Sequence, residues 1–180
     1  LPYKEIFIEY GLVSTLIHAL ILTIFNKNIF SLIAATCIFY SLSIYLIGIL
    51  TYKFTLNKYY SFFATFIIFM MYPWPTSPWP NFISFFFLML FCLFYLFSKK
   101  IYFILSGTFL ALAYLSYTLV NNYIIISFLL ILIFLLFFLK KKFDYLFIQK
   151  NYYFLISFTL TISIFFFFLL KNGIFNIWLT

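Results

Sequence analysis

The side chains that could take part in acid–base or charge-stabilising chemistry lie between Tyr3 and His18. Lys4, Glu5 and Glu9 carry charge, and Tyr3 and His18 add a phenol and the chain's single imidazole. A carboxylate beside a cation suits sugar transfer from a lipid phosphate. The carboxylate acts as general base on an acceptor hydroxyl, and the cation stabilises the leaving phosphate. The alternative is a solvated charged face next to a hydrogen-bonded structural histidine.

The remaining inventory excludes several kinds of site. Asp144 is the third and last acidic residue, and no Ser-His-Asp set, phosphate-binding loop or zinc motif occurs. Cys37 and Cys92 each lie inside an apolar run without neighbouring ligand residues, so we expect small hydrophobes and no metal site. No ionisable residue lies deep in a long apolar run, which argues against an ion carrier.

The composition defines the elements that must position these groups. The chain is 67% hydrophobic and 8% charged, with a mean hydropathy of +1.18. A soluble domain of 180 residues cannot hide that much apolar surface. Lipid must therefore be the solvent, and the continuous apolar runs favour helices over a barrel. We predict an all-α, polytopic transmembrane bundle, formed as a single domain over residues 1–180.

Six apolar runs are expected to span the membrane, since about 20 apolar residues cross a bilayer core. They are Ile29–Leu50, Tyr59–Tyr72, Asn81–Phe97, Ile101–Tyr117, Tyr123–Leu139 and Tyr152–Leu170. Ser106-Gly107, Ala111 and Ala113 in the fourth run predict close contact with a neighbouring helix. Phe143–Gln149 is interpreted as a separate amphipathic stub beside the lysines.

Residues 1–28 precede these spans and form an outer-face loop followed by an apolar stretch. Gly11–Phe25 is short for a span, and Gly11, Ser14, Thr15 and His18 recur at helical spacing. We expect an amphipathic helix lying at the outer interface or dipping into the bundle. A true span, with Lys4 on the inside, is the alternative.

The lysines predict which side faces the cytoplasm. Eight of the eleven fall in alternate loops, as Lys53/Lys58, Lys99/Lys100 and Lys140/Lys141/Lys142/Lys150. Lysine-rich short loops stay inside, so Met71–Pro80, Leu119–Asn122 and the N-terminal segment should face out. The net charge of +8 is this positive-inside signal, and no nucleic-acid partner is expected.

The loop Tyr72–Asn81 faces the outer side in this topology. Four prolines within it favour a stiff, extended loop, flanked by Trp74 and Trp79. One interpretation is a rigid wall for a ligand, in which Tyr72, Trp74, Trp79 and Asn81 contact substrate. The other is an interfacial aromatic belt.

Several short motifs occur together in the order of a known family. They are Pro2-Tyr3-Lys4-Glu5-Ile6, Tyr10-Gly11-Leu12, Ala19-Leu20, Phe25-Asn26-Lys27-Asn28, Tyr72-Pro73-Trp74-Pro75, and Lys99-Lys100 followed by Leu105–Ala113. From Leu1 to about Leu139 this ordered set resembles the GT-C membrane glycosyltransferases, in particular the dolichyl-phosphate-mannose protein mannosyltransferases and the bacterial aminoarabinose transferase.

The resemblance implies a function at the outer face of a multi-pass bacterial inner-membrane protein. The donor would be a polyprenyl-phosphate sugar held in membrane lipid, and the acceptor a glycan, lipid or protein. It implies an auxiliary catalytic or substrate-binding role for Glu5, and substrate contacts for Tyr3, Lys4, Glu9 and His18. A divalent cation stays open as a cofactor.

The sequence also departs from the family pattern. Leu12 follows Gly11 where many members have proline, and Tyr117 stands where many have a basic residue. The family's principal acidic residue follows its first span, which would lie upstream of Leu1. The resemblance therefore implies a fragment that lacks this span.

Two other functions stay open. One is a polymerase or ligase of surface polysaccharide. The other is a non-catalytic membrane subunit of an organellar complex, consistent with a Phe-, Tyr-, Ile-, Asn- and Lys-rich composition typical of AT-rich genomes.

Overall fold

The computed structural model describes residues 11–25, 28–71, 80–117, 130 and 145–171, and every regular element in these parts is an α-helix. In chain order the helices are α2 (Leu12–Ile24), α3 (Ile29–Thr55), α4 (Lys58–Met71), α5 (Pro80–Tyr95), α6 (Lys100–Ser116) and α8 (Tyr145–Lys171). The predicted all-α class is confirmed for these parts of the chain.

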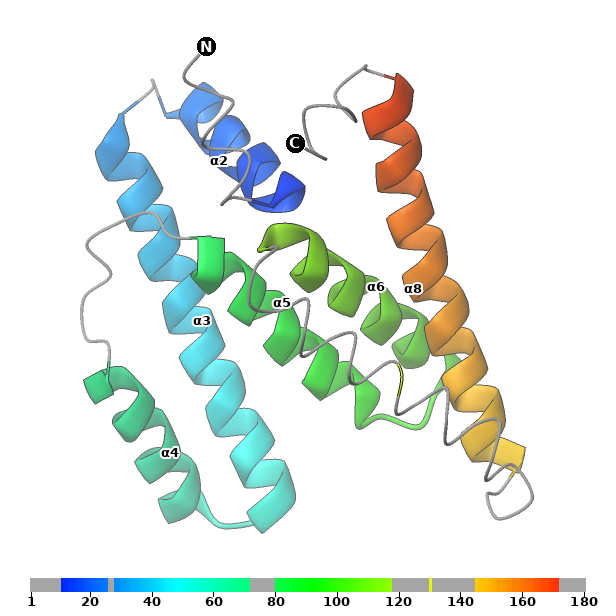
Figure 1. The fold of residues 1–180 in the computed structure, drawn as a ribbon. Helices are drawn as coiled ribbons and strands as arrows, with labels where there is room; N and C mark the ends of the chain where they lie inside the picture. Colours follow the sequence, from blue (N-terminus) through cyan, green and yellow to red (C-terminus); the bar gives the residue numbers. More distant parts are fainter. Residues whose placement is uncertain (1–10, 26–27, 72–79, 118–129, 131–144, 172–180) are drawn as a thin grey trace.

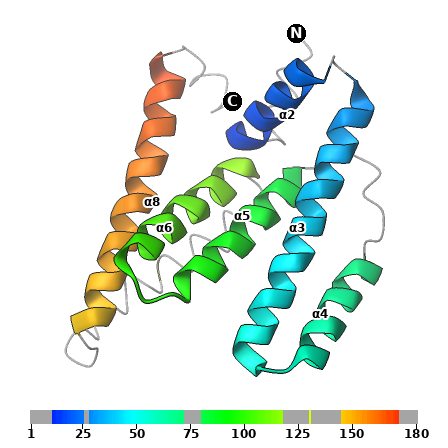
Figure 2. The ribbon, with the colours of Figure 1, turned by 180° about the vertical axis from the view of Figure 1, so that it is seen from behind.

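The helices from α3 to α6 pack in two antiparallel pairs (Figure 1). α3 pairs with α4, and α5 pairs with α6, while α5 joins the two pairs by also contacting α3. α8 packs along α6 on the far side from α3. Seen from behind, α2 lies across the end where α6 finishes (Figure 2), and it contacts α3, α5 and α6.

Asparagine side chains begin both helices of the first pair. The Asn28 side chain accepts a hydrogen bond from the Phe30 amide at 3.0 Å and caps α3. α3 ends at Thr55, and the next residue, Leu56, has a left-handed φ of 52°, a conformation that commonly follows the end of a helix. The Asn57 side chain then accepts from the Tyr59 amide at 2.8 Å, so the chain reverses within two residues.

The core lies where α5, α6 and α8 meet. Its buried members are Phe91 from α5, Leu110 and Ala111 from α6, and Phe154 and Phe158 from α8. Leu110, Ala111 and Phe154 are at most 1% exposed. The predicted close contact through the small residues of α6 is confirmed, because Ser106, Gly107, Ala111 and Ala113 are all buried.

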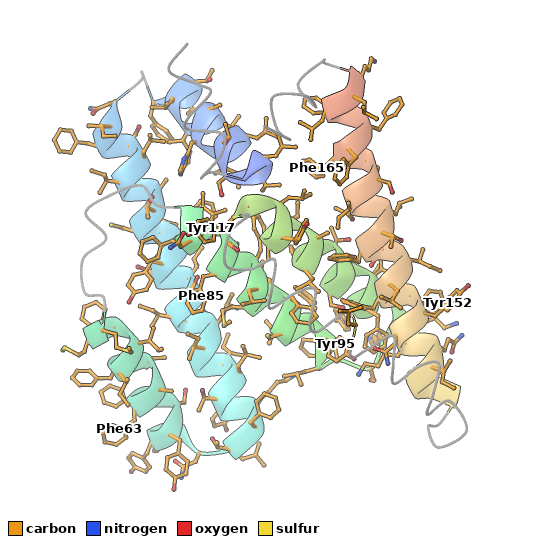
Figure 3. The ribbon with its side chains drawn as sticks, in the orientation of Figure 1. Phe63, Phe85, Tyr95, Tyr117, Tyr152 and Phe165 are labelled. Atoms are coloured by element: carbon orange, nitrogen blue, oxygen red, sulfur yellow. The ribbon has the colours of Figure 1, made fainter. Side chains whose placement is uncertain are left out.

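α4 is packed much less tightly. It has no buried residue, and it contacts α3 alone among its principal neighbours. Phe63, 57% exposed, projects from the side of α4 that faces away from α3 (Figure 3). Tyr95, by contrast, lies at the end of α5 close to the start of α8 (Figure 3).

Five of the six predicted apolar runs contain helices, with shifted ends. α3 continues beyond Leu50 to Thr55, and α8 begins at Tyr145 rather than Tyr152. The separate stub predicted over Phe143–Gln149 is therefore wrong from Tyr145 onward, because that segment is the first part of α8. The run Tyr123–Leu139 falls mostly outside the described residues.

Two of the described helices are long and apolar enough to cross a membrane. They are α3 and the Ile148–Lys171 part of α8. α2, α4, α5 and α6 are shorter apolar helices. The described residues thus give an all-α chain with two candidate spans, while the six-span arrangement stays a prediction.

Candidate functional site

The start of α2 and the end of α6 meet at one backbone carbonyl. The Ser116 carbonyl accepts the Gly11 amide at 3.2 Å and the Ser14 hydroxyl at 2.6 Å. The last carbonyls of a helix lack intrahelical donors, and the first amides lack acceptors. Each helix end therefore satisfies the other, with the positive end of α2 facing the negative end of α6.

Gly11 is required for this close approach. A Cβ at Gly11 would overlap the Leu115 carbonyl oxygen and lie 2.5 Å from the Ser116 carbonyl carbon. Both contacts are with backbone that cannot move aside. We call the contact among Gly11, Ser14 and Ser116 the junction.

The polar stripe of α2 faces the protein. Gly11 and Ser14 are buried, and Thr15 and His18 are half-buried. Thr15 donates its hydroxyl back to the Gly11 carbonyl at 3.1 Å. The stripe therefore faces the other helices, and the junction uses the Gly11 amide and the Ser14 hydroxyl. This packing agrees with a helix that dips into the bundle, while the position of α2 at the outer interface stays a prediction.

His18 is one of two predicted site residues that the structure describes. Burial lowers the pKa of its imidazole below the usual value near 6.5. The ring is therefore neutral at pH 7 and acts as a polar, uncharged group beside the bundle.

Asn81 is the other described site residue, and it is exposed in the first turn of α5. Nearby, the Ser84 hydroxyl donates to the Ala113 carbonyl at 2.9 Å, which fixes the start of α5 against the last turn of α6. The Tyr40 and Phe82 rings meet edge to face at 5.1 Å and tie the same turn to α3. The start of α5 and the start of α2 thus both pack against the end of α6.

The other predicted site residues lie outside the described residues: Tyr3, Lys4, Glu5, Glu9, Tyr72, Trp74 and Trp79. The first of their segments joins the described chain at Gly11, and the second joins it at Met71, the end of α4, and at Pro80, the start of α5. The structure brings Gly11 and Pro80 to the same end of α6 (Figure 1).

A second polar region, which the sequence analysis did not assign to a site, lies at the opposite end of the bundle. Lys53 is in the last turn of α3, Lys58 begins α4, Lys99 and Lys100 begin α6, and Lys150 is near the start of α8. Only Lys171, among the described lysines, lies at the other end of α8. We call this region the lysine end.

Aromatic rings hold several of these ammonium groups. Lys53 Nζ lies 3.5 Å from the Phe97 ring centre, and Lys150 Nζ lies 4.8 and 4.5 Å from the Tyr95 and Phe103 ring centres. Cation–π contacts fix a cation in place without neutralising its charge. All three acidic residues of the chain fall outside the described residues, so no carboxylate pairs with these lysines there.

Asn151 is the polar residue that the sequence analysis missed. Its side chain is fully buried, and its carbonyl oxygen accepts the Tyr95 hydroxyl at 2.7 Å. An asparagine next to Lys150 is typical of a polar loop, so the sequence alone favours a loop there. The apolar residues Tyr145–Ile148, about two turns before Tyr152, are the signal that places Asn151 inside a helix.

The described residues contain no group of three His, Cys, Asp or Glu side chains close enough to hold a metal ion. Comparison with models of known families, with curated proteins and with solved structures gave no match.

Proposed function

We propose that the chain is a multi-pass membrane protein of six spans, with the lysine end in the cytoplasm. α3 and α8 support this by their length and apolar composition. Large apolar side chains on α3, α4 and α8 are more than half exposed, among them Ile38, Phe62, Ile164 and Phe167. Lipid is the solvent that such a surface requires. Concentration of the described lysines at one end agrees with the positive-inside rule.

We propose further that this protein transfers a sugar from a polyprenyl-phosphate donor to an acceptor at the outer face of a bacterial inner membrane. The observation that supports it is the junction. The segment bearing Lys4, Glu5 and Glu9 is attached at Gly11, and the loop bearing Trp74 and Trp79 continues into α5 at Pro80, on the same side of the bundle. Both attachment points lie away from the lysine end.

In this proposal the N-terminal segment supplies the charged groups. Glu5 acts as base on the acceptor hydroxyl or orients it, and Lys4 stabilises the negative charge of the leaving lipid phosphate. The junction limits how far these groups can lie from the bundle, since only five residues separate Glu5 from Gly11. The proposal requires a lateral opening between helices on this side, through which a lipid-linked donor would reach these groups from the bilayer.

The test is Glu5→Gln in the full-length protein, assayed in membranes with a polyprenyl-phosphate sugar. Loss of a carboxylate that acts as base costs about 10²–10⁴ in rate. Asp144→Asn is the matched control, because it removes a carboxylate predicted to lie on the cytoplasmic side. We expect normal folding in both variants and loss of transfer in Glu5→Gln alone. Full activity in Glu5→Gln would contradict the proposed role, and equal losses in both would mean that Glu5 has no special part.

A further inference from the structure

A groove of about 340 Å³ opens between α3 and α4 near the lysine end. From α3 it is lined by residues on one helical face: Tyr45, Gly48, Ile49, Tyr52 and Lys53. Ser61 and Thr65 of α4 form the other wall, and the Ser61 hydroxyl donates to the Gly48 carbonyl at 2.7 Å. This hydrogen bond holds the two helices together along the base of the groove.

The groove is apolar along most of its walls and has a lysine at one end. Ile49 and the exposed rings of Tyr45 and Tyr52 provide apolar and aromatic surface. Lys53 lines the groove itself. Lys58 is not among the lining residues, but it begins α4 five residues later, with its ammonium 5.5 Å from the Tyr59 ring centre. The Phe97 ring fixes the Lys53 ammonium from one side without cancelling its charge.

We propose that this groove binds one anionic phospholipid of the cytoplasmic leaflet. The phosphate would lie at Lys53 and Lys58, and the upper part of an acyl chain would lie against Tyr45 and Ile49. Basic pockets between helices on the cytoplasmic side are suited to anionic headgroups. Charge complementarity favours this occupant, because Lys53 lines the groove and its ammonium keeps its charge beside the Phe97 ring. The inference rests on the membrane orientation proposed above and not on sugar transfer.

The test is binding of dioleoylphosphatidylglycerol to the purified full-length protein in a neutral detergent, followed by native mass spectrometry. Dioleoylphosphatidylcholine serves as the lipid control. We expect clear preference for phosphatidylglycerol, reduced about fivefold by Lys53→Gln and about 25-fold by Lys53→Gln with Lys58→Gln, from the usual contribution of each lysine near a membrane surface. Lys53→Arg, which keeps the positive charge, should retain the preference for phosphatidylglycerol that Lys53→Gln loses.

A matched double variant separates the groove from the charge of the whole lysine end. Lys99→Gln with Lys100→Gln removes the same charge from the start of α6 and should leave binding within about twofold. Ile49→Trp, which fills the groove and keeps both lysines, should also weaken binding while circular dichroism confirms folding. Equal binding of both lipids, or equal losses from the two double variants, would overturn the proposal. Full competition by free glycerol 3-phosphate would overturn it too, because a phosphate site alone would then suffice.

Discussion

The α6–α8 contact and the α3–α4 contact are built from the same kinds of residue and pack differently. At Gly107 the backbone of α8 comes so near that a Cβ would overlap Ser157 Oγ and the Phe154 carbonyl oxygen. At Gly48 the nearest atom to such a Cβ is a side-chain methyl, Thr65 Cγ2, at 2.9 Å. One interface is closed over buried aromatic rings, and the other keeps an open groove beside exposed ones.

The difference shows what stabilises each part of the molecule. Lipid tails are as apolar as leucine, so burial of apolar surface alone does not join helices in a bilayer. Close packing and interhelical hydrogen bonds do. Both interfaces have hydrogen bonds, since the Ser61 hydroxyl and the Tyr40 hydroxyl donate across the α3–α4 contact as Tyr95 donates from α5 to α8. Close packing over buried side chains occurs between α5, α6 and α8, whereas α4 has no buried residue and leaves its apolar surface for lipid.

The largest contrast is expected from truncating one phenylalanine in each region. Phe154 is fully buried, and Phe154→Ala should destabilise the protein by about 3–5 kcal/mol through lost contacts and a cavity. Phe63 is 57% exposed, and Phe63→Ala should change stability by less than about 0.5 kcal/mol. Thermal unfolding in detergent measures both. Similar losses of stability in the two variants would mean that Phe63 is packed against other protein groups and that the contrast between the two regions is wrong.

The same substitution, glycine to alanine, at Gly107 and at Gly48 compares the two interfaces directly. Gly107→Ala forces α6 and α8 apart and should cost about 1–3 kcal/mol. Gly48→Ala needs only a shift of the Thr65 methyl group. The higher helix propensity of alanine stabilises the helix by about 1 kcal/mol and so offsets the cost of that shift. We expect a lower melting temperature for Gly107→Ala alone. A larger effect at Gly48 would reverse the ranking of the two interfaces.

A smaller effect is expected from the part-buried hydrogen bond between Tyr95 and Asn151 at the lysine end. Tyr95→Phe removes the donor to Asn151 and should cost about 0.6 kcal/mol, the mean for hydrogen bonds between membrane helices. Tyr152→Phe is the control, since Tyr152 is 64% exposed on α8. Chemical denaturation curves compare the two, and indistinguishable curves would assign no net stability to the hydrogen bond.

The smallest effect concerns His18 and pH. Because burial lowers its pKa in the folded state, the unfolded chain binds the proton more readily, and acid favours unfolding. The destabilisation should appear as the pH falls through about 6.5, the unfolded pKa. The melting temperature of the wild type should therefore drop more between pH 7.5 and 5.5 than that of His18→Gln. Parallel curves would show that His18 is equally protonated in both states.

Local patterns in the sequence predicted the helices well. Continuous apolar runs predicted five described helices, and small residues around Gly107 predicted close contact with a neighbouring helix, which is α8. Asn28 and Asn57 mark helix starts because an asparagine side chain accepts nearby amide hydrogens. The start of α8 was misplaced because Lys150 and Asn151 look polar, although the helix continues through them.

Contacts between distant residues could not be predicted. The junction joins Ser14 to Ser116, and the part-buried hydrogen bond joins Tyr95 to Asn151, and neither pair shares a local pattern. The polar stripe of α2 faces the bundle because it contacts the end of α6. The spacing of residues within α2 cannot predict where α6 ends. Of the candidate site, the sequence predicted a common side of the membrane, and the structure added that Gly11 and Pro80 adjoin the same helix end.

The most direct test of the account is the side of the membrane on which each end of the bundle lies. Single cysteines are introduced at Lys99 and at Lys171 in a chain whose Cys37 and Cys92 are replaced by alanine. Intact cells are then treated with a membrane-impermeant maleimide. We predict labelling of the cysteine at position 171, and labelling at position 99 only after the membrane is permeabilised. The reverse pattern, or equal labelling of both in intact cells, would contradict a membrane bundle with its lysine end in the cytoplasm.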